Sequence, residues 1–309
     1  MNYTLRDPNG NVLLSVESTP VVTEADMKAD LDKAAKACES AFDEVTKYQD
    51  AMAVMSSEGF GEQAKVVASK VWEKIKELLK RIIEFIKEIF VRGGAKIKAT
   101  KLLKRVEAMD DSEIDTFSTG LGVKFKLSYV PILPLREFTT GISTLVSFIH
   151  GMKLTEKVDN GEKNDIFSEQ MDKLLKSLPT EIEPLVKGEI DLTTDSEHSK
   201  YKTGYLSLLG ITDKKTMINY LKGVISEDNA LFDILKKIDQ SSKDWMNVVN
   251  KTTEDSDVIK TCSEVSKVLS KLTKLTWSFI NVSLSIIDIV TTKPTGDPTK
   301  TMLPLSYQL

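Results

Sequence analysis

The sequence contains few of the residues on which catalytic and metal sites usually depend. Among its 309 residues are two cysteines, Cys38 and Cys262, and two histidines, His150 and His198. Two cysteines exclude a disulfide framework, and both occupy apolar positions of helical patterns, where a buried thiol and a reducing compartment are expected. Neither histidine has another ligand at metal-binding spacing, so the sequence predicts no metal site and no cofactor.

Motifs for catalysis and phosphate binding are also missing. The sequence has no G-x-S-x-G segment, and no serine or cysteine lies near a histidine in a nucleophile arrangement. The clusters Gly59-Phe60-Gly61, Gly93-Gly94 and Gly120-Leu121-Gly122 do not extend to a Walker or dinucleotide-binding pattern. We therefore predict that the protein is not an enzyme and has no small-molecule substrate.

Long hydrophobic runs are absent too. The longest apolar stretch without a charged residue or histidine, 275–287, has thirteen residues, whereas a transmembrane helix needs about 20 apolar residues. The first ten residues do not predict a secretory signal, because no positive segment precedes an apolar run. A content of 41% hydrophobic and 28% charged residues is typical of a soluble globular protein.

A basic amphipathic helix is the strongest pattern that the sequence does contain. Apolar residues at alternating spacings of four and three predict one stripe along it: Val71, Ile75, Leu78, Ile82, Phe85 and Ile89. Between Lys65 and Arg105 thirteen Lys or Arg residues stand against four acids, in a chain whose net charge is -4. The positive charge is therefore concentrated in one segment.

An acidic segment precedes this helix. Residues 1–58 contain eleven acidic and five basic residues. They begin with a pattern that predicts a β-hairpin over 3–16, and continue from Thr23 with apolar residues at heptad spacing. Glycines near position 60 should end this helix. Two heptad helices joined by a short loop predict an antiparallel hairpin, in which the acidic helix lies against the basic one.

The remainder of the chain predicts more helices and one strand. Strict alternation near 123–129 indicates a strand, and helices are expected at 136–152, 165–178, from Thr212 to Ile225, from a cap at Ser226 to about residue 250, and at 256–290. We expect a mainly α protein with an N-terminal helical hairpin, a C-terminal helical bundle and a small strand-containing insertion around 117–135. The segments would be 1–58, 59–109, 110–290 and an extended tail, 291–309.

The basic segment is open to three interpretations. The first interpretation is a core helix with a solvated charged face, because acids are interleaved at helical spacing. It also suits contact with DNA or another anionic surface, which five residues just downstream favour because no acid intervenes: Lys96, Lys98, Lys101, Lys104 and Arg105. A basic amphipathic helix is equally typical of a membrane-active, pore-forming protein.

The junction between the acidic and basic segments carries a resemblance. The run Ser56-Ser57-Glu58-Gly59-Phe60, followed by the helix KVWEKIKELLKRIIEFIKEIF, resembles the junction in head proteins of giant tailed bacteriophages. In that family a prohead protease removes an N-terminal propeptide by cutting after a small-x-Glu sequence. The resemblance implies cleavage after Glu58, with Ser56 two places before it and Gly59 as the mature N-terminus.

The resemblance also implies a place and partners. It predicts a structural or internal head protein in the virion, assembled in the bacterial host cytoplasm among other head or scaffold proteins, processed by the prohead protease, and in non-specific contact with packaged DNA. Loss of residues 1–58 would change the net charge from -4 to +2, which suits a particle that is being filled with DNA. The alternatives are a pore-forming protein and a helical interaction module that is never processed.

Overall fold

The structure is a computed structural model, and it describes most of the helical part of the chain. The described residues are 3–6, 12–16, 24–57, 61–110, 134–151, 209–251 and 256–291, with the single positions 173, 176 and 206. The strand expected at 123–129 and the insertion around 117–135 lie outside the described residues, except for the start of a helix at 135, so the structure gives the insertion no support. Most of the helix expected at 165–178 and the tail 291–309 beyond Thr291 also lie outside them.

The N-terminal β-hairpin is confirmed. Strand β1 (Tyr3–Arg6) pairs antiparallel with β2 (Val12–Val16), and Leu5 lies opposite Leu14. The two strands align over four residue pairs, and their register shifts between Leu5 and Arg6. Apart from this hairpin, the described elements are helices.

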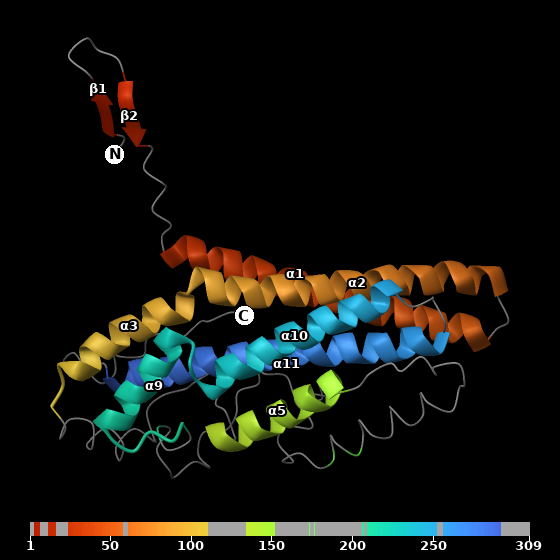
Figure 1. Ribbon diagram of the computed structural model, residues 1–309. Helices are drawn as coiled ribbons and strands as arrows, with labels where there is room; N and C mark the ends of the chain where they lie inside the picture. Colours follow the sequence, from red (N-terminus) through yellow and green to blue (C-terminus); the bar gives the residue numbers. More distant parts are fainter. Residues whose placement is uncertain are drawn as a thin grey trace, which may run out of the picture.

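The predicted helical hairpin is confirmed as well. Helix α1 (Glu24–Ser57) and helix α2 (Gly61–Arg92) run antiparallel and lie side by side (Figure 1). Helix α3 (Gly94–Glu107) continues the chain after Gly93, which has a left-handed backbone with φ 59°. Glycine adopts that conformation without the steric cost that other residues meet, and the chain changes direction between the two helices there.

The second half of the molecule supplies the rest of the bundle. Helix α5 (Leu135–Gly151), helix α9 (Lys214–Ser226), helix α10 (Ala230–Lys251) and helix α11 (Ser256–Thr291) follow in order. Helices α10 and α11 lie between the α1–α2 hairpin and α5, while α9 packs against α3 (Figure 1). The helical bundle predicted from the sequence is therefore present in the described residues.

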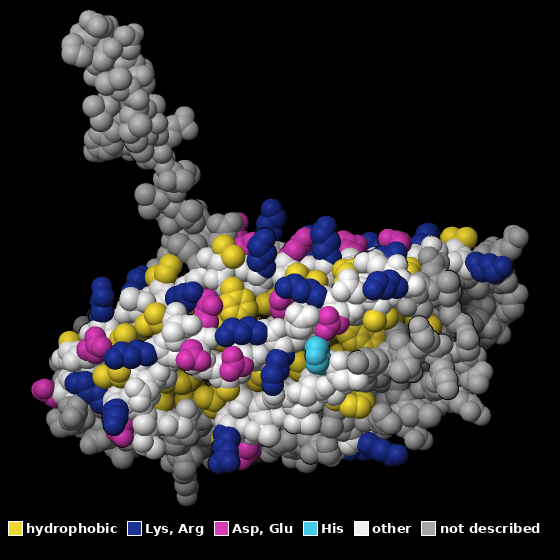
Figure 2. Space-filling model, in the orientation of Figure 1, with side chains coloured by type: hydrophobic (Ala, Val, Ile, Leu, Met, Phe, Trp, Pro, Cys, Tyr) yellow, Lys and Arg dark blue, Asp and Glu magenta, His cyan; other side chains and the backbone are white. Residues whose placement is uncertain are grey.

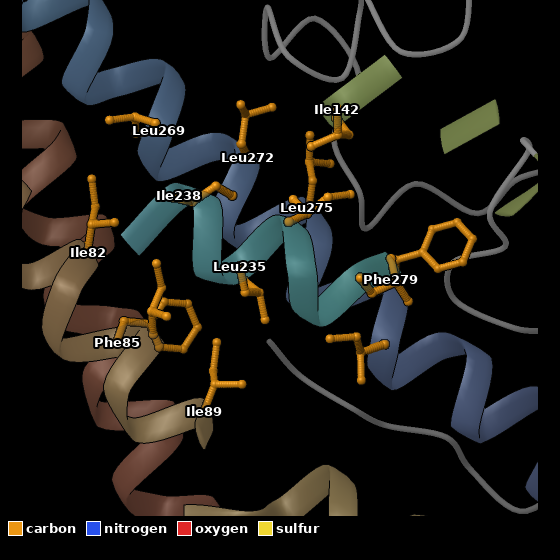
Figure 3. Close-up of a cluster of buried hydrophobic side chains, with 14 of the residues drawn as sticks. Ile82, Phe85, Ile89, Ile142, Leu235, Ile238, Leu269, Leu272, Leu275 and Phe279 are labelled. Carbon is orange, nitrogen blue, oxygen red and sulfur yellow. The ribbon is translucent and has the colours of Figure 1, made fainter. Parts of the chain in front are cut away.

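The stripe of α2 forms the centre of the core. All six of its predicted stripe residues are buried, and Phe85 and Ile89 point toward Leu235 of α10 (Figure 3). Leu272 and Phe279 of α11 belong to the same core. Since α2 contacts α1 on one side and both α10 and α11 on the other, its apolar face is covered by three helices.

Helix α11 is buried on most of its faces even though it is rich in serine and threonine. Its buried hydroxyl groups mostly donate hydrogen bonds to carbonyl groups of the preceding turn, for example Thr273 to Leu269 at 2.8 Å and Thr276 to Leu272 at 2.8 Å. Such bonds satisfy the hydroxyl within its own helix. A helix with many polar residues can therefore occupy the middle of the bundle.

Two predicted helix caps differ from the structure. Helix α9 is capped by Asp213 and not by Thr212, because the Asp213 carboxylate accepts the N–H of Thr216 at 2.7 Å while the Thr216 hydroxyl accepts the N–H of Asp213 at 3.0 Å. This reciprocal pair is a capping box. The helix starts one residue later than Thr212 would allow.

The cap of α10 is Asn229 and not Ser226. The side-chain oxygen of Asn229 accepts the N–H groups of Leu231 and Phe232 at 3.0 and 3.1 Å. Ser226 instead ends α9, and Glu227 after it adopts a left-handed backbone with φ 55°. The turn between α9 and α10 includes the residues after Ser226, so α10 begins later than a cap at Ser226 predicts.

We predict that truncation of Phe279 strongly destabilises the fold. Its ring stacks on Phe138 of α5 with 4.4 Å between the ring centroids, and both side chains are buried. Phe279→Ala leaves a cavity and should lower the free energy of unfolding by about 3–5 kcal/mol. Urea denaturation followed by circular dichroism measures this loss.

The matched control is Val66→Ala, because the Val66 side chain on α2 is 58% exposed. A change at such a position should stay within about 0.5 kcal/mol. Equal destabilisation by the two substitutions would contradict the packing of α5 on α11.

Candidate cleavage junction and basic surfaces

The predicted cleavage site falls between two helices. Helix α1 ends at Ser57 and α2 begins at Gly61, which leaves three residues between them. The backbone of Ser56 lies in the last turn of α1, whereas Glu58 and Gly59 lie outside the described residues. The scissile bond implied by the sequence therefore belongs to neither helix of the hairpin.

The acidic and basic helices pair across the hairpin as expected. The Lys74 ammonium of α2 forms an ion pair with Glu44 of α1 and another with Glu77, the latter at 2.9 Å. The hydrogen bond that Lys74 donates to Glu44 is the largest cause of the raised pKa of Lys74, and the one that it donates to Glu77 lowers the pKa of Glu77. Both shifts favour the charged forms, so this cluster stays ionised at neutral pH.

Within α2 four of the eight basic residues pair with acids of the same helix: Lys74, Lys76, Lys80 and Arg81. Arg81 contacts Glu84 at 2.9 Å and Lys76 contacts Glu73 at 2.7 Å. In Figure 2 basic and acidic side chains are interspersed over the visible face of the molecule. This part of the basic segment thus has the character of a solvated helix face.

The five basic residues predicted to bind DNA lie on α3, and the structure does not gather them into one patch. Lys96 pairs with Glu227, at the end of α9, at 2.6 Å, and Arg105 pairs with Asp288 of α11 at 2.7 Å. Lys98 donates to the hydroxyl of Ser285 at 3.0 Å. Lys101 and Lys104 have exposed side chains.

The acids that meet α3 come from distant parts of the chain. Lys96 and Glu227 are 131 positions apart, and Arg105 and Asp288 are 183 apart. The absence of acidic neighbours in sequence therefore did not mean an absence of acidic neighbours in space. Glu227, Ser285 and Asp288 all lie outside residues 1–58, so removal of that segment leaves these three contacts in place.

A second row of lysines, which the sequence analysis did not single out, lies on α11. Lys267, Lys271 and Lys274 are spaced by four and three residues and so share one helix face. All three are half-buried and face α1. The sequence shows these lysines at heptad spacing in an otherwise apolar helix, but the spacing does not reveal which helix covers them.

Each lysine of this row meets a different group of α1. Lys274 pairs with Glu39 at 2.5 Å, and Lys271 lies over the Phe42 ring at 5.6 Å from its centroid. Lys267 donates to the side-chain oxygen of Gln49 at 2.8 Å. Burial lowers the pKa values of Lys267 and Lys271, because the covered environment disfavours the charged form.

The described residues contain three further polar features: a groove, a surface histidine and two cysteines. A groove of about 550 Å³ between α5 and α10 is lined mainly by hydroxyl side chains, with Asp233 and Lys237 beside them. His150 contacts Asp244 at 3.4 Å on the surface, and His198 lies outside the described residues. No cluster of three metal-binding side chains occurs in the part of the chain that the structure describes.

Both cysteines are buried and unpaired by disulfides. The Cys38 sulfur on α1 lies 3.4 Å from the Ser270 hydroxyl on α11, and Cys262 is within α11. Burial raises the pKa of Cys38, and it raises the pKa of Cys262 to about 12. Such thiols are protonated at neutral pH and react slowly with thiol reagents.

The raised pKa of Cys262 predicts a loss of stability at alkaline pH. The folded state keeps a proton that the unfolded state loses above its ordinary pKa of 9.0. The stabilising contribution is complete below pH 9 and is lost as the pH rises toward 12, at up to about 1.4 kcal/mol per pH unit. Urea titrations of the wild type at pH 8, 9 and 10 measure this slope.

Cys262→Ala should remove this part of the slope, whereas the exposed control Val66→Ala should retain it. Tyr220, whose pKa burial raises to about 12, titrates in all three proteins and cancels in the comparison. Equal slopes for wild type and Cys262→Ala would contradict the shielding of the thiol.

The geometry thus comprises a helix boundary at the expected cleavage site, basic residues of α3 that contact Glu227 and helix α11, and a row of lysines on α11 that α1 covers. No described helix is both long enough and apolar enough to cross a membrane. No family model, curated protein or solved structure matches the chain.

Proposed function

We propose that this protein is a non-enzymatic structural or internal head component of a large tailed phage, matured by cleavage after Glu58. The observation that carries the proposal is the coincidence of three boundaries at one point. The Ser-x-Glu sequence, the change from acidic to basic charge, and the division between α1 and α2 all fall within residues 56–61. A cut there separates a whole helix from the bundle without breaking one.

The burial pattern of the hairpin supports α1 as the removable part. Nine apolar side chains of α2 between Val71 and Ile89 are buried, whereas the described side chains of α1 contribute four: Leu31, Cys38, Ala41 and Val45. Two of these four are small, so each adds little apolar area. The bundle formed by α2, α10 and α11 therefore keeps its main core when α1 leaves.

In this proposal the mature protein contacts packaged DNA without reading its sequence, among other head or scaffold proteins in the virion. The change of net charge from -4 to +2 on loss of residues 1–58 favours that contact. The exposed lysines Lys101 and Lys104 on α3 are accessible before and after cleavage. They supply a contact that does not depend on processing.

The same structure argues against the pore-forming alternative. The side chains that would enter a membrane interface, such as Trp72 and Phe85, are buried within the bundle. Insertion would require α2 to leave its partners α10 and α11. Leakage of dye from liposomes distinguishes the two functions, since a head protein should cause none.

Mass spectrometry of purified particles tests the proposed maturation. Trypsin cuts after Lys47 and Lys65, so intact protein yields the peptide 48–65 across the junction. Mature protein should instead yield the peptide from Gly59 to Lys65, with a non-tryptic N-terminus. Abundant peptide 48–65 in mature particles would refute cleavage and favour the unprocessed interaction module.

Substitution of the glutamate provides the matched control. Glu58→Ala, produced during infection, should keep the full-length protein because the protease requires glutamate before the cut bond. Glu17→Ala alters the other Ser-x-Glu sequence, Ser15-Val16-Glu17, and should leave the cut after Glu58 unchanged. Continued production of the Gly59 terminus by the Glu58→Ala protein would place the specificity elsewhere.

A further inference from the structure

We propose that removal of α1 uncovers a DNA-binding surface formed by Lys267, Lys271 and Lys274 of α11 together with Lys74 of α2. This inference rests on the proposed cleavage after Glu58 and identifies the site that the cleavage switches on. The ligand is the phosphate backbone of duplex DNA, bound without regard to sequence. The surface differs from the basic residues of α3, because Lys96, Lys98 and Arg105 contact Glu227, Ser285 and Asp288, which the cut leaves in place.

The first step of the argument is that α1 covers all four lysines. Lys74 and Lys274 each hold an acid of α1, Glu44 and Glu39 respectively. Lys267 is held by Gln49, and Lys271 lies over an aromatic ring of the same helix. One helix therefore neutralises two of these ammonium groups and shields the other two from solvent.

The second step is that the lysines remain correctly placed without α1. Their backbones belong to α2 and α11, which contact each other directly. On α11 the row extends over seven positions along the helix, from Lys267 to Lys274, or about 10 Å at 1.5 Å per residue. A rigid helix thus presents three ammonium groups in a line, although Glu264 of α11 also lies near Lys267.

The third step is that a cut in the linker weakens the hold of α1. While residues 58–60 connect the helices, α1 sits beside its binding face at an effective concentration in the millimolar range. After cleavage the same contacts must act between separate molecules at the concentration of the protein. Four buried side chains, the partly buried Phe42, Tyr48 and Met52, and a set of partly exposed polar contacts then oppose dissociation among the described residues.

The charges favour a polyanion as the ligand. Loss of α1 takes away the acids that face the row and ends the burial that disfavours charge on Lys267 and Lys271. Flexible lysine side chains on a regular helix suit phosphates, which need positive charge more than fixed geometry. DNA is the polyanion present at high concentration in the proposed location.

The test uses the full chain with a recognition sequence for a specific laboratory protease placed at residues 58–60. Duplex DNA is titrated with uncut and cut protein at 50 and 200 mM salt. Each phosphate neutralised adds roughly 0.9 to the slope of log affinity against log salt. The three lysines of α11 should therefore steepen the slope by about 2.7 after cleavage, which is a loss of about 40-fold between the two salt concentrations.

Two triple variants locate the binding gained on cleavage. Lys267→Gln, Lys271→Gln and Lys274→Gln together should abolish the gain. The matched set on α3, Lys98→Gln, Lys101→Gln and Lys104→Gln, should lower the binding of cut and uncut protein alike and leave the gain intact. Retention of the gain in the α11 variant, or its loss in the α3 variant alone, overturns the inference.

The two cysteines report whether α1 has left. After cleavage Cys38 should react rapidly with a thiol reagent, while Cys262 should stay protected because it lies inside the bundle. A Cys38 that stays protected shows that α1 still covers the lysines, and reaction of both shows that the bundle has opened. Either result overturns the inference.

The outcomes separate this inference from the proposed function. A cut protein that binds DNA through α11, combined with particles lacking a Gly59 terminus, would refute the maturation and leave the surface real. Particles with that terminus, combined with a cut protein that gains no affinity for DNA, would refute the surface and leave the maturation intact. Equal gains for DNA and for anionic lipid vesicles would overturn the assignment of DNA as the ligand.

Discussion

The apolar face of α2 is the constraint on which the bundle depends. Its buried residues extend from Val71 to Ile89 and are too broad a surface for one neighbouring helix to cover. Helices α10 and α11 cover it on one side and α1 on the other. The two sides differ in degree, because large side chains such as Leu235 and Phe232 pack from α10, whereas the buried side chains described for α1 are Leu31, Cys38, Ala41 and Val45.

Among the described residues, α1 therefore adds a smaller part of the buried core than α10 does. Its small seam residues allow close approach to α2 and α11, and its polar groups at the edges bind lysines of both helices. Such partly exposed ion pairs are individually weak and are screened by salt. The attachment therefore relies on the covalent link and on many modest contacts, which is the condition under which a single cut changes the state of the protein.

Periodicity predicted the helices well because a helix records its buried face in its own sequence. The stripe of α2, the hairpin and the bounds of α11 at Ser256 and about Val290 follow from residues that are neighbours along the chain. The partners of α3 could not be found this way, since Glu227 and Asp288 approach only after folding. The caps at Asp213 and Asn229 were missed by one and three residues, because several polar residues in each turn could have served.

Charge along the sequence and charge on the surface are related through pairing. A count over residues 1–58 gives the change in net charge on the proposed cleavage, but it does not show which part of the protein surface changes its charge. In the structure, the acids that depart include Glu39 and Glu44, each within contact of a lysine that stays. Since charges interact mainly within a Debye length of about 8–10 Å, the change is concentrated on the face beneath α1. Lys96 and Arg105 of α3 pair with Glu227 and Asp288, which the proposed cut would leave in place, so its effect would fall mainly on the face beneath α1.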